Sequence, residues 1–309
     1  MNTEDVLTPK MLSVCIVSFR SRDVLEVCLD SLYEHVPAWL KLEVIVVDND
    51  SRDGSLQMVR AKFPDVIILE NRYNAGFSKA TNQGLSNAKG EYLLWLNPDT
   101  MILKESLEPL VRFLESHPEA GIVGPRLLNE DGSFQPQCRR GMPDPIAVFG
   151  YFTGLCRFFP KHAGLNGYLL THMPENQSAR VTAVSGAALL TRSVVRDQIG
   201  LLDERIFAYA EDLDWCVRAS NAGWQVWYTA DSSLVHLGGK GGSRTAPFTR
   251  IRAWHNGVWI FYQKHVAHQY NAVANGAIYA GIIASFIFSL SLNAIYIGFN
   301  KLYRALHPV

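Results

Sequence analysis

Short apolar runs alternate with amphipathic segments over the first 125 residues, and this alternation constrains the fold more than any other feature. Buried strands are predicted by the runs at 12–18, 43–47, 66–69, 92–96 and 121–124. Helices are predicted between them, at 23–36, 54–62, 78–87 and 107–115. Strands that alternate with helices usually pair in parallel, so we expect an α/β fold with a mostly parallel sheet flanked by helices.

Two of these strands end in acidic turns. The stretch VVDNDS places Asp48 after the second strand, and WLNPDT places Asp99 after the fourth. Parallel sheets bind ligands at the carboxyl ends of their strands. Asp48 could accept a hydrogen bond from a ribose hydroxyl or a base N–H, and Asp99 could ligate a divalent metal ion that bridges to a diphosphate. A simple Asx turn is the structural alternative for both aspartates.

The regular alternation stops after about residue 125. Residues 129–180 are rich in proline, glycine and basic residues, and we interpret them as an irregular segment that faces the substrate. Regular structure is predicted again further on, with a strand at 181–190, a helix at 193–199, and short strands at 225–228 and 233–237.

The stretch RIFAYAEDLDWCVRASNAGW contains three acidic residues within four positions: Glu211, Asp212 and Asp214. They open a predicted helix that ends near Asn221, so a purely structural explanation is that they interact favourably with the helix dipole. Asp214 can also pair with Arg218, one turn later. Glu211 and Asp212 are not readily explained in this way, and a carboxylate that stays ionised at a helix N-terminus can serve as a general base.

His236 ends a predicted strand and precedes the loop GGKGGS, residues 238–243. A histidine in this position is either a hydrogen-bonded structural residue or a metal ligand. Glycine-rich backbone can approach phosphate oxygens closely, and Lys240 and Arg244 could pair with them. The Walker pattern GxxxxGK[ST] is absent from the sequence.

Composition excludes some classes of function. The 29 basic and 29 acidic residues give a formal net charge of zero, so a nucleic-acid partner is not expected. The five cysteines form no CxxC pair, which is typical of a reducing compartment and argues against a cysteine-based zinc site. The start MNTEDVLTPK has no apolar run, so a signal peptide is not expected.

The C-terminal region has a different character. From Gln269 to Asn300 the sequence contains no Asp, Glu, Lys or Arg, and 277–299 is nearly all apolar or small. A membrane helix needs about 20 such residues, and we favour a re-entrant or interface-lying helix over a full span. The alternatives are a helix buried in the fold and a helix buried in a homodimer.

Taken together, the motifs resemble those of the family 2 glycosyltransferases, and among these the rhamnosyltransferase-like branch. They are, in order, SFRSRD, VVDNDSRDGS, NAGFSKATNQG with WLNPDT, SGAALLTRS, FAYAEDLDWCVRASNAGW and VHLGGKGG, and they cover about residues 11–245. The resemblance implies a GT-A fold and an inverting transfer from a nucleoside-diphosphate sugar to a glycan or lipid-linked glycan acceptor. A nucleotidyltransferase and an inactive, membrane-attached nucleotide-sugar-binding protein are the alternative functions.

The resemblance also implies roles for individual residues. Asp212 would be the catalytic base, while Asp99 and His236 would ligate Mg²⁺ or Mn²⁺. Binding of the donor would involve Ser18, Arg20, Asp48, Asp50, Gly76, Asn97, Glu211 and Lys240. The aromatic residues around the base, namely Phe207, Tyr209 and Trp215, would form walls for the sugar and the acceptor. One departure matters: the DxD metal motif appears as Asn97-Pro98-Asp99, with a single carboxylate, which implies a weaker metal site that depends on the diphosphate.

The resemblance and the tail lead to an expected organisation of the whole chain. Residues 1–265 would form the GT-A domain, and residues 266–309 a membrane-associated helical tail. The donor would be dTDP-rhamnose, with UDP-sugars next. The protein would act in cell-surface polysaccharide synthesis at the cytoplasmic face of a bacterial inner membrane.

Overall fold

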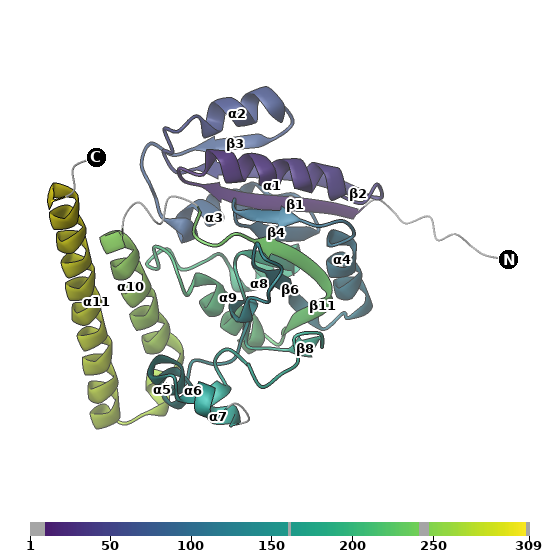
Figure 1. The fold of residues 1–309 in the computed structure, drawn as a ribbon. Helices are drawn as coiled ribbons and strands as arrows, with labels where there is room; N and C mark the ends of the chain where they lie inside the picture. Colours follow the sequence, from purple (N-terminus) through teal and green to yellow (C-terminus); the bar gives the residue numbers. More distant parts are fainter. Residues whose placement is uncertain (1–9, 160–161, 241–246, 307–309) are drawn as a thin grey trace.

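A mixed sheet of nine strands forms the centre of the computed structural model, which describes residues 10–159, 162–240 and 247–306 (Figure 1). Its strands are β1 (Lys10–Ser18), β2 (Leu40–Asp48), β3 (Ile67–Glu70), β4 (Tyr92–Leu96), β5 (Thr100–Ile102), β6 (Ala120–Leu128), β8 (Ala179–Arg180), β10 (Ala188–Arg192) and β11 (Gln225–His236). The main order is β3-β2-β1-β4-β10-β6-β11-β5, and β8 pairs with β11.

The first four strands of this order are parallel, as expected from the alternation of strands and helices. Ser18 pairs with Asp48 at the ends of β1 and β2, and Ile16 pairs with Leu96 near the end of β4. The register therefore brings the carboxyl ends of three strands to one edge of the sheet. Strand β10 is antiparallel to both of its neighbours, β4 and β6.

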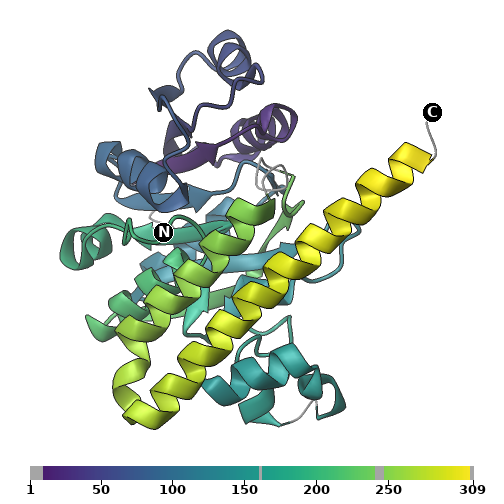
Figure 2. The same ribbon diagram turned by 90° about the vertical axis from the view of Figure 1, so that its left-hand side faces the viewer.

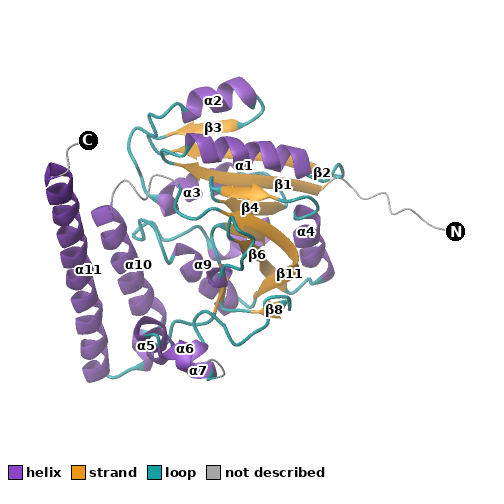
Figure 3. Cartoon of the chain, in the orientation of Figure 1, coloured by secondary structure: helices purple, strands orange, loops and turns teal. Residues whose placement is uncertain are grey.

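Helices surround the sheet and connect most of the strands (Figure 3). They are α1 (Arg22–His35), α2 (Ser55–Lys62), α3 (Phe77–Asn87), α4 (Leu107–Ser116), α5 (Pro145–Thr153), α6 (Leu155–Phe158), α7 (Ala163–Asn166), α8 (Ser193–Ile199), α9 (Glu211–Asn221), α10 (Pro247–His265) and α11 (Ala272–Leu306). Each helix predicted over the first 125 residues is present, with ends shifted by a few residues.

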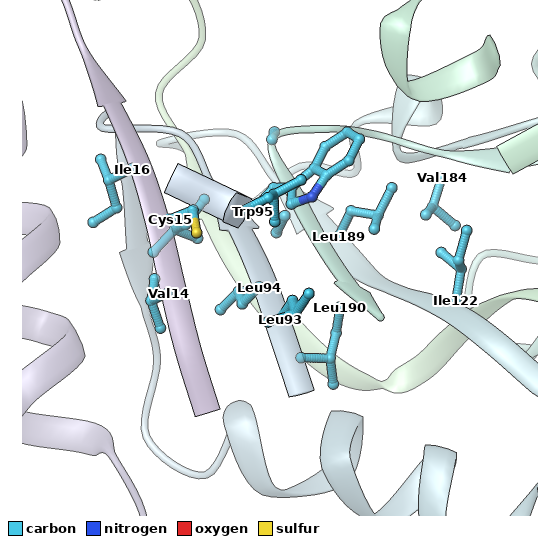
Figure 4. Close-up of a cluster of buried hydrophobic side chains, with 14 of the residues drawn as sticks. Val14, Cys15, Ile16, Leu93, Leu94, Trp95, Ile122, Val184, Leu189 and Leu190 are labelled. Carbon is cyan, nitrogen blue, oxygen red and sulfur yellow. The ribbon is translucent and has the colours of Figure 1, made fainter. Parts of the chain in front are cut away.

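Part of the core lies around β4 and its two neighbours in the sheet, β1 and β10 (Figure 4). All five residues of β4 are buried, which explains why YLLWL is continuously apolar instead of alternating. Val14, Leu94 and Leu189 are fully buried here. Trp215 is also fully buried and lies against Trp95, with 5.1 Å between the ring centroids. It therefore belongs to the core, and the expectation that it forms a wall of the sugar site is wrong.

Three predicted elements differ from the structure. The strand predicted at 181–190 is divided into β9 (Ala183–Val184) and β10, and β9 pairs with β7 (Arg139–Arg140) in a separate two-stranded sheet. The two strands predicted at 225–237 are one strand, β11, with a register shift between Thr229 and Ser233. The segment predicted to be irregular, 129–180, contains α5, α6 and α7.

The last two helices form an antiparallel pair on one side of the domain (Figure 2). Ala272–Phe299 is long and apolar enough to cross a membrane, and none of its most apolar window is buried. The alternative of a helix buried within the fold is therefore wrong.

Candidate active site

The turns after β1 and β2 form the first part of the candidate site. Ser18 and Asp48 are buried side by side, and the Ser18 hydroxyl lies 3.0 Å from that of Ser21. Asp48 accepts hydrogen bonds from the Ser51 amide, at 3.0 Å, and from the Ser51 hydroxyl. The turn expected as the structural alternative is thus present, and a nucleotide would have to share this carboxylate with Ser51.

Two residues of these turns have left-handed backbone conformations. Arg20 has φ 50° and Asp50 has φ 63°, which for residues other than glycine is uncommon. The Arg20 amide donates to the Ser51 hydroxyl at 3.0 Å, and Asp50 accepts from Arg52 Nε at 2.7 Å. A cavity of about 210 Å³ opens beside Asp48 and Asp50, so both carboxylates border a space that a ligand could enter.

Gly76 has a structural reason to be glycine. It has φ +87°, and a Cβ at this position would lie 2.7 Å from the Phe207 ring and from the Phe207 carbonyl oxygen. The Phe77 amide donates to that same carbonyl at 2.6 Å. Gly76 therefore allows the segment before α9 to pack against the start of α3.

Asp99 and His236 come together although they are far apart in the chain. Asp99 is 4% exposed, and its Oδ1 lies 3.4 Å from His236 Nε2. Its Oδ2 accepts from the Lys240 amide at 3.1 Å. Burial raises the pKa of Asp99, but the His236 imidazole and the Lys240 amide outweigh it, so that the pKa lies below its usual value. The carboxylate is therefore ionised at neutral pH.

Gln135 determines how the His236 ring is oriented. The Gln135 amide nitrogen donates to the His236 carbonyl at 2.6 Å, so its oxygen is the atom that lies 3.0 Å from His236 Nδ1. That oxygen can only accept, which puts the proton on Nδ1. Nε2 is thus the ring atom that faces Asp99, at 3.4 Å, and the Asn97 side-chain nitrogen, also at 3.4 Å, and it is the atom available to a metal ion. A second partner that fixes the tautomer is typical of metal-ligating histidines.

These residues fit a divalent cation whose remaining ligands come from elsewhere. The parts of the chain that the structure describes contain no group of three or more His, Cys, Asp or Glu that could hold a metal ion. Asp99 and His236 could supply two ligands, and oxygen atoms of a diphosphate could supply others. The Lys240 ammonium pairs with exposed Glu130 at 2.8 Å, while residues 241–243 of the predicted loop and Arg244 lie outside the described residues.

Asp212 is held by three hydrogen bonds from three different segments. Its Oδ2 accepts from Arg140 Nη2 at 2.6 Å and from the Gly186 amide at 2.8 Å, and its Oδ1 accepts from the Leu213 amide at 2.7 Å. Burial lowers the pKa of Arg140, but Asp212 outweighs it, so that the pKa lies above its usual value. The guanidinium is thus always charged, and its ion pair stabilises the Asp212 carboxylate.

Glu211 is adjacent to Asp212 in the sequence, but its carboxyl group has different surroundings. Burial, and secondarily the charge of Asp212, raise the pKa of Glu211 to about 8. Its Oε2 is buried without a hydrogen-bond partner among the described residues. At neutral pH the two adjacent carboxyl groups therefore differ, because Glu211 is mostly protonated whereas Asp212 is paired with a cation.

A strained turn presents these two residues at the start of α9. Tyr209 has φ 70° and Ala210 has φ 72°, and such conformations cost about 1–3 kcal/mol each. A Cβ at Gly257 of α10 would lie 2.2 Å from the Tyr209 carbonyl oxygen, so only glycine allows this contact. Close packing of α10 thus supports the turn.

Asp214 is the structural member of the acidic group. It is fully buried and pairs with Arg218 Nε at 3.0 Å, as expected for a residue one turn earlier. It also pairs with Lys264 at 2.6 Å and with His265 at 2.7 Å. Asp214 therefore ties α9 to α10 and faces away from the candidate base.

Asp99 and His236 are connected to the candidate base, Asp212, through neighbouring strands. The Asn97 amide donates to the Ala187 carbonyl at 2.9 Å, and Ala187 directly follows Gly186, which binds Asp212. A cavity of about 420 Å³ lies beside His236 and is also lined by Gln135, Cys138 and Ser185, the residue before Gly186. The predicted residues thus fall into two groups, one around Ser18 and Asp48 and one around Asp99 and Asp212.

Sequence reasoning did not identify Arg140, Gln135 or Gly186 as site residues. Arg140 and Gln135 lie in the segment 129–180, where no motif distinguishes them from other polar residues. The only signal for Gly186 is the Ser185-Gly186 pair inside an otherwise apolar run. In the structure that pair is where β9 and β10 separate.

The fold is that of the GT-A glycosyltransferases. One similar solved structure is the mannosyltransferase PcManGT from Pyrobaculum calidifontis in complex with GDP-Man and Mn²⁺, with a TM-score of 0.57, 17% identity, and coverage of 96% of this chain and 81% of that chain. Another is S. aureus TarS 1-349 in complex with UDP-GlcNAc, with a TM-score of 0.57, 17% identity, and coverage of 89% and 72%.

The family follows from the sequence comparison. The model of glycosyl transferase family 2 matches residues 13–178, more than half of the chain, and the protein belongs to this family. A similar characterised protein is the N-acetylglucosaminyl-diphospho-decaprenol L-rhamnosyltransferase of Mycobacterium tuberculosis, 29% identical over 231 residues, which are 71% of this chain and 74% of the relative. The Haloferax volcanii low-salt glycan biosynthesis hexosyltransferase Agl10 is 27% identical over 212 residues, 67% of this chain and 61% of the relative.

Proposed function

We propose that this glycosyltransferase moves a sugar, with inversion, from a nucleoside-diphosphate sugar to a hydroxyl group of a lipid-linked glycan. The observation that carries the proposal is the Asp212 carboxylate, which Arg140 and two backbone amides hold next to the region of Asp99 and His236. Such an arrangement separates the group that activates the acceptor from the groups that bind the diphosphate.

In this proposal Asp212 takes the proton of the acceptor hydroxyl as its oxygen attacks the anomeric carbon. The bond from that carbon to the diphosphate breaks in the same step, so the configuration is inverted and the diphosphate leaves with the bonding electrons. A divalent cation bound by Asp99 and His236 would neutralise charge on the departing diphosphate. Ser18, Asp48 and the turns around them would hold the nucleoside, and Glu211 would contact the donor.

The proposed donor is dTDP-rhamnose, and the proposed acceptor is a lipid-linked sugar diphosphate. The name of the M. tuberculosis relative supports the rhamnosyl group and the acceptor, because it describes rhamnosyl transfer to a lipid-linked N-acetylglucosamine, whereas the dTDP nucleotide rests on the resemblance of the motifs. The described cysteines Cys15, Cys28, Cys138 and Cys216 are unpaired and buried, which is compatible with the cytoplasmic side of the membrane, where nucleotide sugars are made.

The proposal is tested by incubating the full-length protein with Mn²⁺ and a panel of dTDP-, UDP- and GDP-sugars, with and without a lipid-linked N-acetylglucosamine diphosphate. We expect release of the nucleoside diphosphate to depend on the acceptor and to be fastest with dTDP-rhamnose. Binding of donors without any turnover would indicate an inactive binding protein. Release of pyrophosphate from a nucleoside triphosphate and a sugar phosphate would indicate a nucleotidyltransferase.

A further inference from the structure

One side of α11 is covered by α10, and this side carries polar contacts. Tyr262 of α10 donates to Asn275 Oδ1 at 2.6 Å, and Asn275 Nδ2 donates to the Ala267 carbonyl at 3.0 Å. Tyr279 lies against Trp259, with 4.4 Å between the ring centroids. The ring centroids of Phe286 and His255 are 5.2 Å apart. These contacts fix the orientation of α11 over residues 275–286.

The rest of the α11 surface is apolar and uncovered in the described chain. Eight large apolar side chains are each between 48% and 83% exposed, namely Val273, Ile283, Ile287, Phe288, Leu292, Ile295, Tyr296 and Phe299. At about 100° per residue they cover an arc of roughly 220° around the helix. The side of the helix that faces α10 thus carries both polar and aromatic contacts, whereas its uncovered side is apolar, which is the reverse of the uncovered side of a helix on a soluble protein.

The width of this arc and the charge of the region favour a lipid surface over a second copy of the chain. A helix that packs on another helix needs an apolar stripe only about 100° wide, whereas lipid contacts the whole uncovered side. Residues 232–309 contain no Asp or Glu and seven Lys or Arg, of which Lys240 and Lys264 pair with carboxylates from earlier in the chain. Arg250 and Arg252 are exposed near the start of α10. These charges complement anionic lipid headgroups.

The contacts with α10 also limit how α11 can enter a bilayer. If residues 275–286 stay on α10, the uncharged part beyond them is 287–300, which is 14 residues. These span only about 20 Å at 1.5 Å per residue, less than the hydrocarbon thickness of about 30 Å. A full span would require α11 to leave α10, or would draw Arg250 and Arg252 into the hydrocarbon, which is costly.

We infer that α11 lies parallel to the plane of an anionic bilayer, with its uncovered apolar side in the acyl-chain boundary and α10 between it and the catalytic helix α9. This orientation is independent of the chemistry at Asp212. A consequence that does rest on the proposed function is that a lipid-linked acceptor would approach from this same side.

Spin labels at outward positions along α11 test the orientation. Ile283→Cys, Leu292→Cys and Phe299→Cys are labelled one at a time in a Cys156→Ser background, because the other four cysteines are buried. Exposed Glu34→Cys on α1 is the aqueous control. In vesicles that contain phosphatidylglycerol, accessibility to oxygen and to a soluble nickel complex gives the depth of each label. We expect all three labels at one shallow depth, about 5–10 Å below the headgroups.

The other outcomes would overturn the inference. A depth that changes steadily from position 283 to position 299 would indicate a spanning helix. Labels that are shielded from oxygen and show spin–spin coupling to the label of a second copy of the chain would indicate a dimer. The charge contribution is tested with Arg250→Gln/Arg252→Gln, for which we expect about 30-fold weaker binding to anionic vesicles and no change on phosphatidylcholine. Equal binding of parent and variant to anionic vesicles would contradict the role of the headgroups. None of these measurements requires donor or turnover.

Discussion

Arg140 Nη2 lies 2.6 Å from Asp212 Oδ2, although 72 positions separate the two residues. Arg140 also donates to the Val184 carbonyl at 2.9 Å, so its guanidinium joins β9 to the start of α9. The pair fixes the direction of the carboxylate. Since the Leu213 amide is the only described donor to Oδ1, that oxygen retains room for a proton from an acceptor.

Arg140→Met should therefore lower kcat by about 10²-fold with little change in the KM for the donor, because a misplaced base slows the chemical step. Arg140→Lys should restore part of the rate. Arg139→Met is the matched control, because the buried Arg139 donates only to the carbonyls of Met173 and Pro174 among the described contacts. It should lower the Tm without slowing the folded enzyme, and equal losses of kcat in both methionine variants would contradict a positioning role for Arg140.

Asp99→Ala should remove the effect of metal ions on donor affinity, since Asp99 provides the only carboxylate of the motif. His236→Ala should reduce this metal effect less. Calorimetric titration of donor with and without Mn²⁺ measures both effects. Glu130→Ala is the control, because it removes the exposed partner of Lys240 and leaves Asp99 intact. The metal site would be refuted by an Asp99→Ala variant that binds donor like the parent when Mn²⁺ is present.

Glu211 should make the protein less stable as the pH rises. Its pKa is about 8 in the folded state and near 4.5 in the unfolded state, so between these values the folded state binds more protons and the free energy of unfolding falls with increasing pH. Glu211→Gln should remove this dependence and raise stability at pH 8–9. Chemical denaturation of the parent and of Glu211→Gln from pH 5 to 9 measures this difference. If the free energies of unfolding of the two proteins change with pH in parallel, Glu211 is not the cause.

The sequence was sufficient for the parallel half of the sheet because its strands are continuously apolar and are separated by helices. The antiparallel part was harder to predict. The run at 181–190 looks like one strand, but its middle makes tertiary hydrogen bonds, from the Ser185 amide to the Cys138 carbonyl and from the Gly186 amide to Asp212, and it divides there. Similarly, β11 reads as two short strands because its polar middle, Ala230 to Ser232, lies where the register shifts.

The candidate site was predictable where a residue type and a strand end coincide, as for Asp48 and Asp99. The partners that orient these residues were not. Gln135 and Arg140 act through contacts with residues that are 101 and 72 positions away, and nothing local in a single sequence reveals such contacts. Trp215 shows the opposite error, since an aromatic residue beside a candidate base turned out to belong to the core.

The central claim is that Asp212 accepts the proton of the acceptor hydroxyl, and it is tested most directly with Asp212→Asn. The amide keeps the size of the side chain and loses its basicity, so kcat should fall by about 10²–10⁴-fold while the Kd of the donor is unchanged. Asp214→Asn on the same helix should lower the Tm and leave the folded enzyme active, because Asp214 faces Lys264 and His265. An Asp212→Asn variant that turns over at nearly the parent rate would contradict the account.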